Sequence, residues 1–254
     1  MLLNDPPRII ARLDVKGDNV VKGINLEGLR KVGNPKLLAK TYYEQGIDEI
    51  IYMDVVASLY GRNSLYKVIQ EAASEIFVPL TVGGGVRNLE DIRMVLNSGA
   101  DKVAINTEAI KNPKFIKIAS EEVGSQAVVI SIEAKKISTG KWEAYYNNGR
   151  EKSGKDILDW CKECERLGAG ELLVTSVDNE GLEKGMDLEL LNILSSEINI
   201  PIIFSGGIGS YENILDAVPY ADAIALASAL HYKKLNISGI KSCLKENNIL
   251  VREI

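Results

Sequence analysis

The sequence predicts a closed (β/α)8 barrel made of two similar halves, and three observations support this prediction. Short apolar segments alternate with segments of helical period along the whole chain. Four sequence landmarks recur in the same order, 119 to 122 residues further on. Carboxylates and glycine-rich stretches follow the apolar segments at matching places in both halves.

The apolar segments are the expected strands. They lie near residues 8–14, 48–54, 78–82, 102–105, 127–133, 171–176, 201–205 and 223–226. Amphipathic helical patterns fall between them, for example at 35–46, 89–99, 154–168 and 211–218. Strands that alternate with helices in this way pair in parallel. The segment 145–154, "YYNNGREKSG", is expected to be a loop after the fifth strand.

The internal repeat decides how this sheet closes. "GIDEIIYMD" (46–54) matches "GAGELLVTS" (168–176), "VPLTVGGGV" (78–86) matches "IPIIFSGGI" (200–208), and "GADKVAINT" (99–107) matches "YADAIALAS" (220–228). Four strand–helix units, duplicated, close as a (β/α)8 TIM barrel. A doubly wound open sheet leaves the repeat unexplained. We therefore expect one α/β domain over 1–254, with half-repeats of about 1–122 and 123–254.

Composition excludes some classes of function. The chain has 254 residues, of which 46% are hydrophobic and 26% charged, and its net charge is −5. An acidic balance argues against a nucleic-acid or anionic-membrane surface as the main partner. No apolar run approaches the ~20 residues of a membrane span. The start "MLLNDPPRII" lacks the pattern of a signal peptide, so we expect a cytoplasmic protein.

Two acids mark the chemistry of the expected barrel. Asp14 and Glu133 end the first and fifth strands, 119 residues apart. Barrel enzymes carry their active sites at the carboxyl ends of the strands, so these two side chains should face each other across the mouth. They are candidates for a general acid–base pair. The alternative is that each acid only caps the loop after its strand.

Glycine-rich stretches predict two phosphate sites, because glycine lets the backbone approach an anion and present N–H groups to it. "VGGGV" and "SGGIG" follow the third and seventh strands, and small polar residues follow the fourth and eighth. The repeat predicts a substrate with a phosphate at each end. The residues are Gly84, Gly85, Asn106 and Thr107 in one half, and Gly206, Gly207 and Ser228 in the other.

Cysteine and histidine give no metal site. Cys161 and Cys164 form a C-x-x-C inside a helical pattern, and the remaining candidates are Cys243 and the single His231. Four good zinc ligands are hard to assemble from this set. We therefore expect ordinary helix cysteines and no metal or cofactor.

Charged residues open four of the expected strands. They are Arg8, Glu49, Lys102 and Glu171. Two positive and two negative charges at one level can neutralise each other in a ring, whereas unpaired charges would be costly to bury. The alternative is four unrelated surface charges.

The chain resembles a known family. "RIIARLDVKGDNVVKG", "TVGGGV", "GADKVAINT", "GSQAVV" and "SGGIG" are similar to the cyclase subunit of imidazole glycerol phosphate synthase, from end to end of the chain. The resemblance implies a half-barrel duplication, a bisphosphate substrate, and ammonia delivered by a separate class I glutaminase in a heterodimer. It makes Asp14 and Glu133 the essential acids. It also adds further substrate contacts at Lys22, Thr175, Glu180 and Gly181.

The resemblance implies a lyase reaction of histidine biosynthesis. Phosphoribulosyl-formimino aminoimidazole carboxamide ribotide and ammonia give imidazole glycerol phosphate and aminoimidazole carboxamide ribotide. The strand-start charges then form the gate for ammonia, with Asp101 at the glutaminase contact. The chain departs from the family pattern around the mouth, where the family shows aspartate at position 133. The other departures are Glu180, Leu182, Ala104 and Val56.

These departures leave other functions open. One is a paralogue that uses glutaminase-derived ammonia on a nucleotide-sugar derivative in surface-polysaccharide synthesis. Another is a sugar-phosphate isomerase with the same repeat, although an isomerase needs no ammonia gate. A third is an inactive barrel that only activates a glutaminase, against which Asp14, Lys22 and both phosphate sites argue.

Overall fold

The protein is a closed barrel of eight parallel strands. The structure is a computed structural model that describes residues 6–55 and 63–252. Neighbouring strands run in the order β10-β11-β12-β1-β4-β5-β6-β7, and β7 pairs with β10 to close the ring. The barrel strands are β1 (Arg8–Lys16), β4 (Glu49–Asp54), β5 (Leu80–Gly83), β6 (Lys102–Ile105), β7 (Val128–Ser138), β10 (Glu171–Ser176), β11 (Ile202–Ser205) and β12 (Ala223–Leu226). All eight predicted strands are confirmed.

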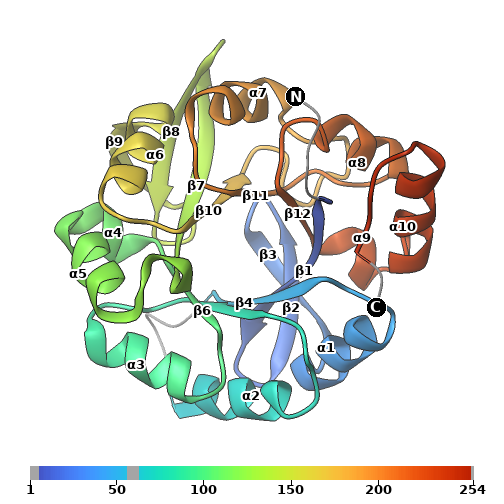
Figure 1. The fold of residues 1–254 in the computed structure, drawn as a ribbon, viewed down its shortest axis with the longest axis horizontal. Coiled ribbons are helices and arrows are strands. Elements are labelled where there is room, and N and C mark those ends of the chain that lie inside the picture. The colour runs from blue at the N-terminus through green and yellow to red at the C-terminus, as the bar shows by residue number, and fades with distance from the viewer. Residues whose placement is uncertain (1–5, 56–62, 253–254) are drawn as a thin grey trace.

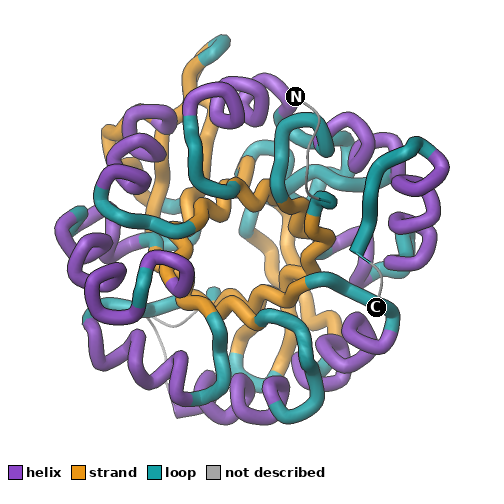
Figure 2. Tube along the Cα trace, viewed as in Figure 1, coloured by secondary structure: helices purple, strands orange, loops and turns teal. Residues whose placement is uncertain are grey.

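Helices surround this ring on the outside, as Figure 2 shows. The helices at the four segments named from the sequence are confirmed. The helices are α1 (Pro35–Glu44), α2 (Asn63–Ala73), α3 (Leu89–Asn97), α4 (Thr107–Lys111), α5 (Lys114–Val123), α6 (Ile157–Arg166), α7 (Leu188–Glu197), α8 (Tyr211–Ala217), α9 (Ser228–His231) and α10 (Ile237–Glu246). A short 3-10 helix, η1 (Ser125–Ala127), precedes β7. No helix in the described part of the chain is long and apolar enough to cross a membrane.

The repeat extends to the helix caps. Asn88 caps α3 by accepting a hydrogen bond from the backbone N–H of Asp91 at 2.9 Å. Ser210, at the matching place in the second half, caps α8 through the N–H of Asn213. Each cap satisfies an N–H that a helix start would leave unpaired. Both halves thus turn from glycine loop to helix by the same device.

Two β-hairpins extend the barrel beyond the predicted elements. β2 (Asn19–Ile24) and β3 (Glu27–Gly33) follow β1, while β8 (Lys141–Tyr146) and β9 (Glu151–Asp156) follow β7. The expectation of a loop at 145–154 is therefore wrong, since only the middle of that segment is a turn. The strand register there pairs Tyr145 with Lys152 and Tyr146 with Glu151. Buried Trp142 and Ala144 anchor β8 against the core.

Side chains alternate between two separate apolar regions along seven of the eight barrel strands, β5 being the exception. One region lies between the strands and the helices and holds most of the core, including Leu13, Phe204 and Trp160. The smaller region fills the inside of the barrel. Its members are Ile10, Ile51, Met53, Ala104, Val129, Leu173, Ile203, Ala223 and Ala225. The alternation follows from the period of two along a strand. Charged interior positions lie above and below this apolar layer, whereas the buried hydroxyl residue Thr81 of β5 is paired in register with Ile51 of the layer.

Burial makes Phe204 a sensitive test of the packing. It is completely buried between β11 and the helices, whereas Phe77 is 81% exposed. We expect Phe204→Ala to lower the free energy of unfolding by about 3–5 kcal/mol, because it removes apolar contacts and leaves a cavity. Phe77→Ala should change it by less than about 0.5 kcal/mol. Urea unfolding followed by circular dichroism measures both, and equal effects of the two substitutions would contradict this packing.

Candidate active site

The two predicted acids lie inside the barrel near its mouth. Asp14 and Glu133 belong to β1 and β7, which stand opposite each other in the strand ring. The exposed fractions of these residues are only 2% and 5%. Each acid lies two residues beyond a polar interior residue, Arg12 on β1 and Ser131 on β7. The strand period thus stacks both acids above the apolar layer.

Asp14 is held in a cluster of charges from both halves. Its carboxylate accepts a hydrogen bond from Arg12 Nε at 3.0 Å and from Lys22 Nζ at 3.4 Å. Lys22, on the β2–β3 hairpin, also pairs with Glu180, which follows β10. The backbone N–H of Asn25 donates to the Glu180 carbonyl at 2.8 Å. The hairpin therefore lies across this side of the mouth, and in Figure 1 it is seen through the strand ring.

Glu133 has different neighbours. Its carboxylate accepts a hydrogen bond from Asn106 Nδ2 at 2.7 Å. The same amide group donates to the backbone carbonyls of Ser131 and Tyr145 at 2.9 and 3.2 Å. Thr107 Oγ1 donates to Asn106 Oδ1 at 3.1 Å. A predicted phosphate-site residue, Asn106, thus also orients the second predicted acid.

Electrostatics separates the two acids. Burial disfavours the charged form of Asp14, but the charges of Arg12 and Lys22 outweigh burial and hold its pKa below the usual value. Burial raises the pKa of Glu133 to about 8, although Arg12 and the hydrogen bond from Asn106 oppose the rise. At neutral pH one carboxyl is therefore ionised and the other is protonated. Such a separation defines a base and an acid within one site.

A cavity of about 420 Å³ opens beside Glu133. Arg12 and Glu133 lie at its inner end, and Gly84, Gly85 and Thr107 of the first predicted phosphate site line its wall. Asp14 and Lys22 are not part of this lining. Two basic side chains that the sequence analysis did not select, Arg87 and Lys111, lie at the rim. In the sequence only their positions point to them, because Arg87 follows the glycine loop and Lys111 follows the fourth strand.

The second predicted phosphate site has the same backbone but far less space. Gly206, Gly207 and Ser228 line a hollow of about 10 Å³, together with Glu180 and Gly181. The residue before α4 has φ −121° and ψ −80°, and the residue before α9 has φ −129° and ψ −83°, so the repeat is kept in conformation. A carboxylate next to an anion site is unfavourable. The pairing of Glu180 with Lys22 offsets this charge.

The glycines of both loops are also required by the fold. Gly84 and Gly206 have φ +105° and +107°, a conformation that other residues rarely adopt. A Cβ atom on Gly84 would lie 2.3 Å from the Asp54 carbonyl oxygen, and one on Gly207 would lie 2.0 Å from that of Gly185. Tight turns thus account for these glycines without a ligand, and phosphate binding rests on the cavity and its basic rim.

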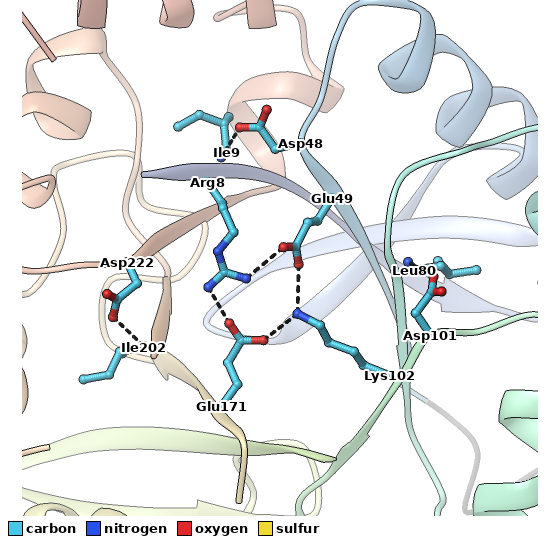
Figure 3. Close-up of polar contacts among 10 residues, drawn as sticks. All are labelled: Arg8, Ile9, Asp48, Glu49, Leu80, Asp101, Lys102, Glu171, Ile202 and Asp222. Atoms are coloured by element: carbon cyan, nitrogen blue, oxygen red, sulfur yellow. Dashed lines mark hydrogen bonds and ion pairs between the residues drawn. The ribbon is translucent and has the colours of Figure 1, made fainter. Parts of the chain in front are cut away.

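Four charges form a closed ring at the opposite end of the barrel, as Figure 3 shows. Arg8 Nη1 lies 2.8 Å from Glu49 Oε1, and Arg8 Nη2 pairs with Glu171. Lys102 Nζ lies 3.3 Å from Glu49 Oε2 and 2.9 Å from Glu171 Oε2. Each carboxylate contacts both cations, so the buried charges are paired rather than isolated. These are the four residues that the sequence analysis placed at one level.

Asp101 lies beside this ring but belongs to a different pattern. Its carboxylate accepts the backbone N–H of Leu80 at 2.8 Å. Asp48 accepts the N–H of Ile9, and Asp222 that of Ile202, at 2.7 and 2.8 Å (Figure 3). Each aspartate directly precedes a barrel strand and fixes the start of a neighbouring strand. Asp101 therefore has a structural role in the barrel itself.

The remaining sequence observations are placed as follows. Ala104 lines the large cavity, and the exposed fraction of Leu182 is 38%. Val56 lies outside the described residues. Cys161 and Cys164 are buried on α6 among apolar side chains, where burial raises the pKa of both thiols. Unreactive helix cysteines fit this environment.

Thr175, which the sequence analysis selected from the resemblance, binds Arg12. Its Oγ1 accepts a hydrogen bond from Arg12 Nη1 at 2.7 Å. Arg12 itself was not selected, although it touches Asp14 and lines the cavity. Its signal was an arginine in the buried run "RIIARLDV", at an interior position of the first strand.

Two buried acids with oppositely shifted pKa values lie at the carboxyl ends of barrel strands, and one of them, Glu133, lines the large cavity, which is the arrangement of a (β/α)8-barrel enzyme. Comparison with known proteins gives the family. Residues 8–236 match the model of the histidine biosynthesis protein family. The chain therefore belongs to the histidine biosynthesis protein family.

Curated relatives narrow this assignment. The chain is 55% identical over 205 residues to imidazole glycerol phosphate synthase subunit HisF of Legionella pneumophila, an alignment that covers 81% of this chain and 97% of the relative. Proteins of the same name from Lactococcus lactis subsp. cremoris and Alkaliphilus metalliredigens are 47% and 45% identical. Their alignments cover 97% and 96% of this chain, and 96% and 98% of those relatives.

The raised pKa of Glu133 predicts a pH-dependent stability. The folded state keeps the proton to about pH 8, whereas an unfolded glutamate loses it near pH 4.5. The stabilising contribution is fully present below pH 4.5 and is lost as the pH rises to about 8. We expect Glu133→Gln to gain stability relative to wild type over this window, on the order of a few kcal/mol. Unfolding in urea at pH 5, 6, 7, 8 and 9 measures the difference, and a constant difference would refute the raised pKa.

Proposed function

We propose that this chain is the ammonia-dependent cyclase subunit of imidazole glycerol phosphate synthase in histidine biosynthesis. In this reaction ammonia and phosphoribulosyl-formimino aminoimidazole carboxamide ribotide give imidazole glycerol phosphate and aminoimidazole carboxamide ribotide. The observation that carries the proposal is the identity of 45–47% to subunits of that name over almost the full length of both chains. The ionised and protonated carboxyls at the mouth supply the proton transfers that imine formation and ring closure need.

The large cavity and the matching loop of the other half bind the substrate. One phosphate binds at Gly84, Gly85 and Thr107, beside Arg87 and Lys111. The second binds at the matching loop of the other half, near Gly207 and Ser228. The small hollow there must widen on binding, and the pair between Lys22 and Glu180 is the contact that closes it now.

Asp14 acts as the base and Glu133 as the acid in this proposal. Asp14 is buried outside the cavity lining and its carboxylate is bonded to Arg12 and Lys22, so in this proposal the Lys22 ammonium turns away to let Asp14 reach the substrate. If the Lys22 ammonium moves toward the second phosphate, it pairs with the phosphate charge and releases the Asp14 carboxylate in the same movement. Binding of the second phosphate is thus coupled to exposure of the base.

Ammonia enters through the ring at the base of the barrel. The relatives are named as subunits, which supports a complex with a separate glutaminase on this face. The ring carries two positive and two negative charges, so its net charge is zero. A ring without net charge does not attract the ammonium ion in preference to neutral ammonia. Lys102 is the most accessible of the four, because its side chain is 19% exposed, against 4–11% for the others. It is therefore the member that can move aside.

Asp14→Asn tests the proposed base. We expect turnover of the bisphosphate with ammonium salt to fall at least about 10²-fold, because the amide keeps the volume but cannot accept a proton. Glu133→Asp shortens the side chain by one methylene group, which moves the carboxyl away from the substrate and should lower turnover as well. Substrate loss is followed with the purified protein. Near-normal turnover by Asp14→Asn would remove Asp14 from the mechanism, and higher turnover by Glu133→Asp would point to a different acceptor.

Lys102→Ala tests the gate and the partner. We expect glutamine-dependent turnover with the glutaminase to fall about tenfold or more, because Glu49 and Glu171 lose one of their two cations and close on Arg8. Turnover with ammonium salt should change less than about twofold, since that ammonia also enters at the mouth. Lys241→Ala is the matched control, because Lys241 pairs with Asp48 at the base but outside the ring.

Equal loss in the two assays would assign Lys102 to the fold rather than to a gate. A chain that binds no co-encoded glutaminase, yet turns over ammonia, would overturn the partner.

A further inference from the structure

Arg12 crosses the inside of the barrel just below the mouth. It is 2% exposed, and it starts from β1. Its Nη1 donates to Thr175 Oγ1 on β10 at 2.7 Å and to Ser205 Oγ on β11 at 3.4 Å. β10 is three strands away from β1 in the ring. The guanidinium therefore spans most of the interior, above the apolar layer and beneath both acids.

A count of its donors leaves one nitrogen free for a ligand. A guanidinium has five N–H groups. The Nε–H is bonded to Asp14 Oδ1 at 3.0 Å, and the two hydrogens of Nη1 face Thr175 and Ser205. Nη2 has no hydrogen-bond partner among the described residues, and it is not among the fully buried atoms that lack one. Since Arg12 lines the large cavity beside Glu133, these two donors point to the space that a ligand would fill.

The two halves of the barrel carry very different side chains at the position of Arg12. The residue equivalent to Arg12 in the second half is Ser131, which precedes Glu133 by two positions as Arg12 precedes Asp14. Ser131 is buried, and its Oγ has no partner among the described residues. At this position the first half thus has a long, positively charged side chain, and the second half has a small hydroxyl side chain. On this side of the barrel Glu133 and Asn106 line the cavity and are bonded to each other.

We propose that Arg12 is a catalytic residue that donates from Nη2 to the substrate carbonyl oxygen as ammonia adds to the carbonyl carbon. This inference rests on the proposed function. The ammonia lone pair forms the C–N bond while the electron pair of the C=O π bond moves onto oxygen, where negative charge grows. Donors fixed in advance at such an oxygen stabilise the transition state more than the ground state.

Glu133 completes the step without any other reactant. Its carboxyl proton passes to the new alkoxide oxygen, and the resulting carboxylate takes one proton from the positively charged nitrogen. The product is a neutral carbinolamine, and Glu133 ends protonated as it began. Arg12 and Glu133 are buried, both line the cavity, and they lie close enough for the charge of Arg12 to oppose the raised pKa of Glu133, so both can reach one oxygen. The anchors at Asp14 and Thr175 hold the guanidinium in place before the reaction starts.

The test compares Arg12→Met, Arg12→Lys and the control Ser131→Ala with wild type, using ammonium salt and the bisphosphate. We expect Arg12→Met to lower kcat about 10²- to 10³-fold and to change KM by less than about threefold, as for loss of an oxyanion donor. Arg12→Lys keeps a cation beside Asp14 and should keep the fold. It should still lose at least about tenfold in kcat, because one ammonium cannot bond Asp14, Thr175 and the substrate together. Ser131→Ala should match wild type.

Chemical rescue separates a catalytic from a structural role. Arg12→Ala leaves a space that a free guanidinium ion can enter, and we expect millimolar guanidinium chloride to raise its kcat at least about fivefold. Potassium chloride at the same ionic strength should not. A kcat for both Arg12→Lys and Arg12→Met within threefold of wild type would overturn the inference, and so would a loss confined to KM. Absence of rescue, with Arg12→Lys as active as wild type, would assign Arg12 to the fold alone. If wild type itself shows no turnover, the proposed function fails, and the role of Arg12 fails with it.

Discussion

Every second side chain of the eight closed strands points into the interior of the barrel, where most side chains are buried, and this constraint governs both ends of the barrel. The middle of the interior is apolar, with Ile10, Ile51, Val129 and Leu173 from four different strands. Charge occurs only above and below this layer, and there each charge has a partner. A buried ion without a partner costs several kcal/mol, so each group of charges must be completed by residues from several strands.

The two ends meet this constraint in opposite ways. At the base, four charges alternate in sign and close on one another, so the set is complete without a ligand. At the mouth, Arg12 and Lys22 neutralise Asp14 and Glu180, while Glu133 meets the constraint by keeping its proton. The burial that makes charge costly thus separates the pKa values of the two acids, as the proposed proton transfers require. The cost of burying charge therefore accounts for the complete ring at the base and for the pKa values of the acids at the mouth.

Duplication explains the architecture better than it explains the chemistry. The halves share their hairpins, helix caps and glycine loops. They differ where side chains enter the mouth, with Arg12 against Ser131 and Asn106 against Ala227. The two sides also differ in space, with the large cavity on one side and a hollow of only about 10 Å³ on the other. Backbone symmetry therefore supports an asymmetric site, as a reaction with distinct acid and base requires.

The sequence by itself determined the strand order, the closure of the barrel, and the positions of the two acids and of the four charges at the base. The period of two along a strand and the internal repeat can both be read without any tertiary contact. The sequence did not determine the hairpins, since β9 has the sequence EKSGKD without an apolar residue, and Trp142 of β8 is buried only by tertiary contact. Arg12 was hidden for a related reason. One arginine in an apolar run gains its meaning from Thr175 and Ser205, which lie 163 and 193 residues further along the chain. Likewise, only the assembled interior keeps buried Asp14 ionised and raises the pKa of Glu133, because the pKa depends on burial and on charges brought from distant strands.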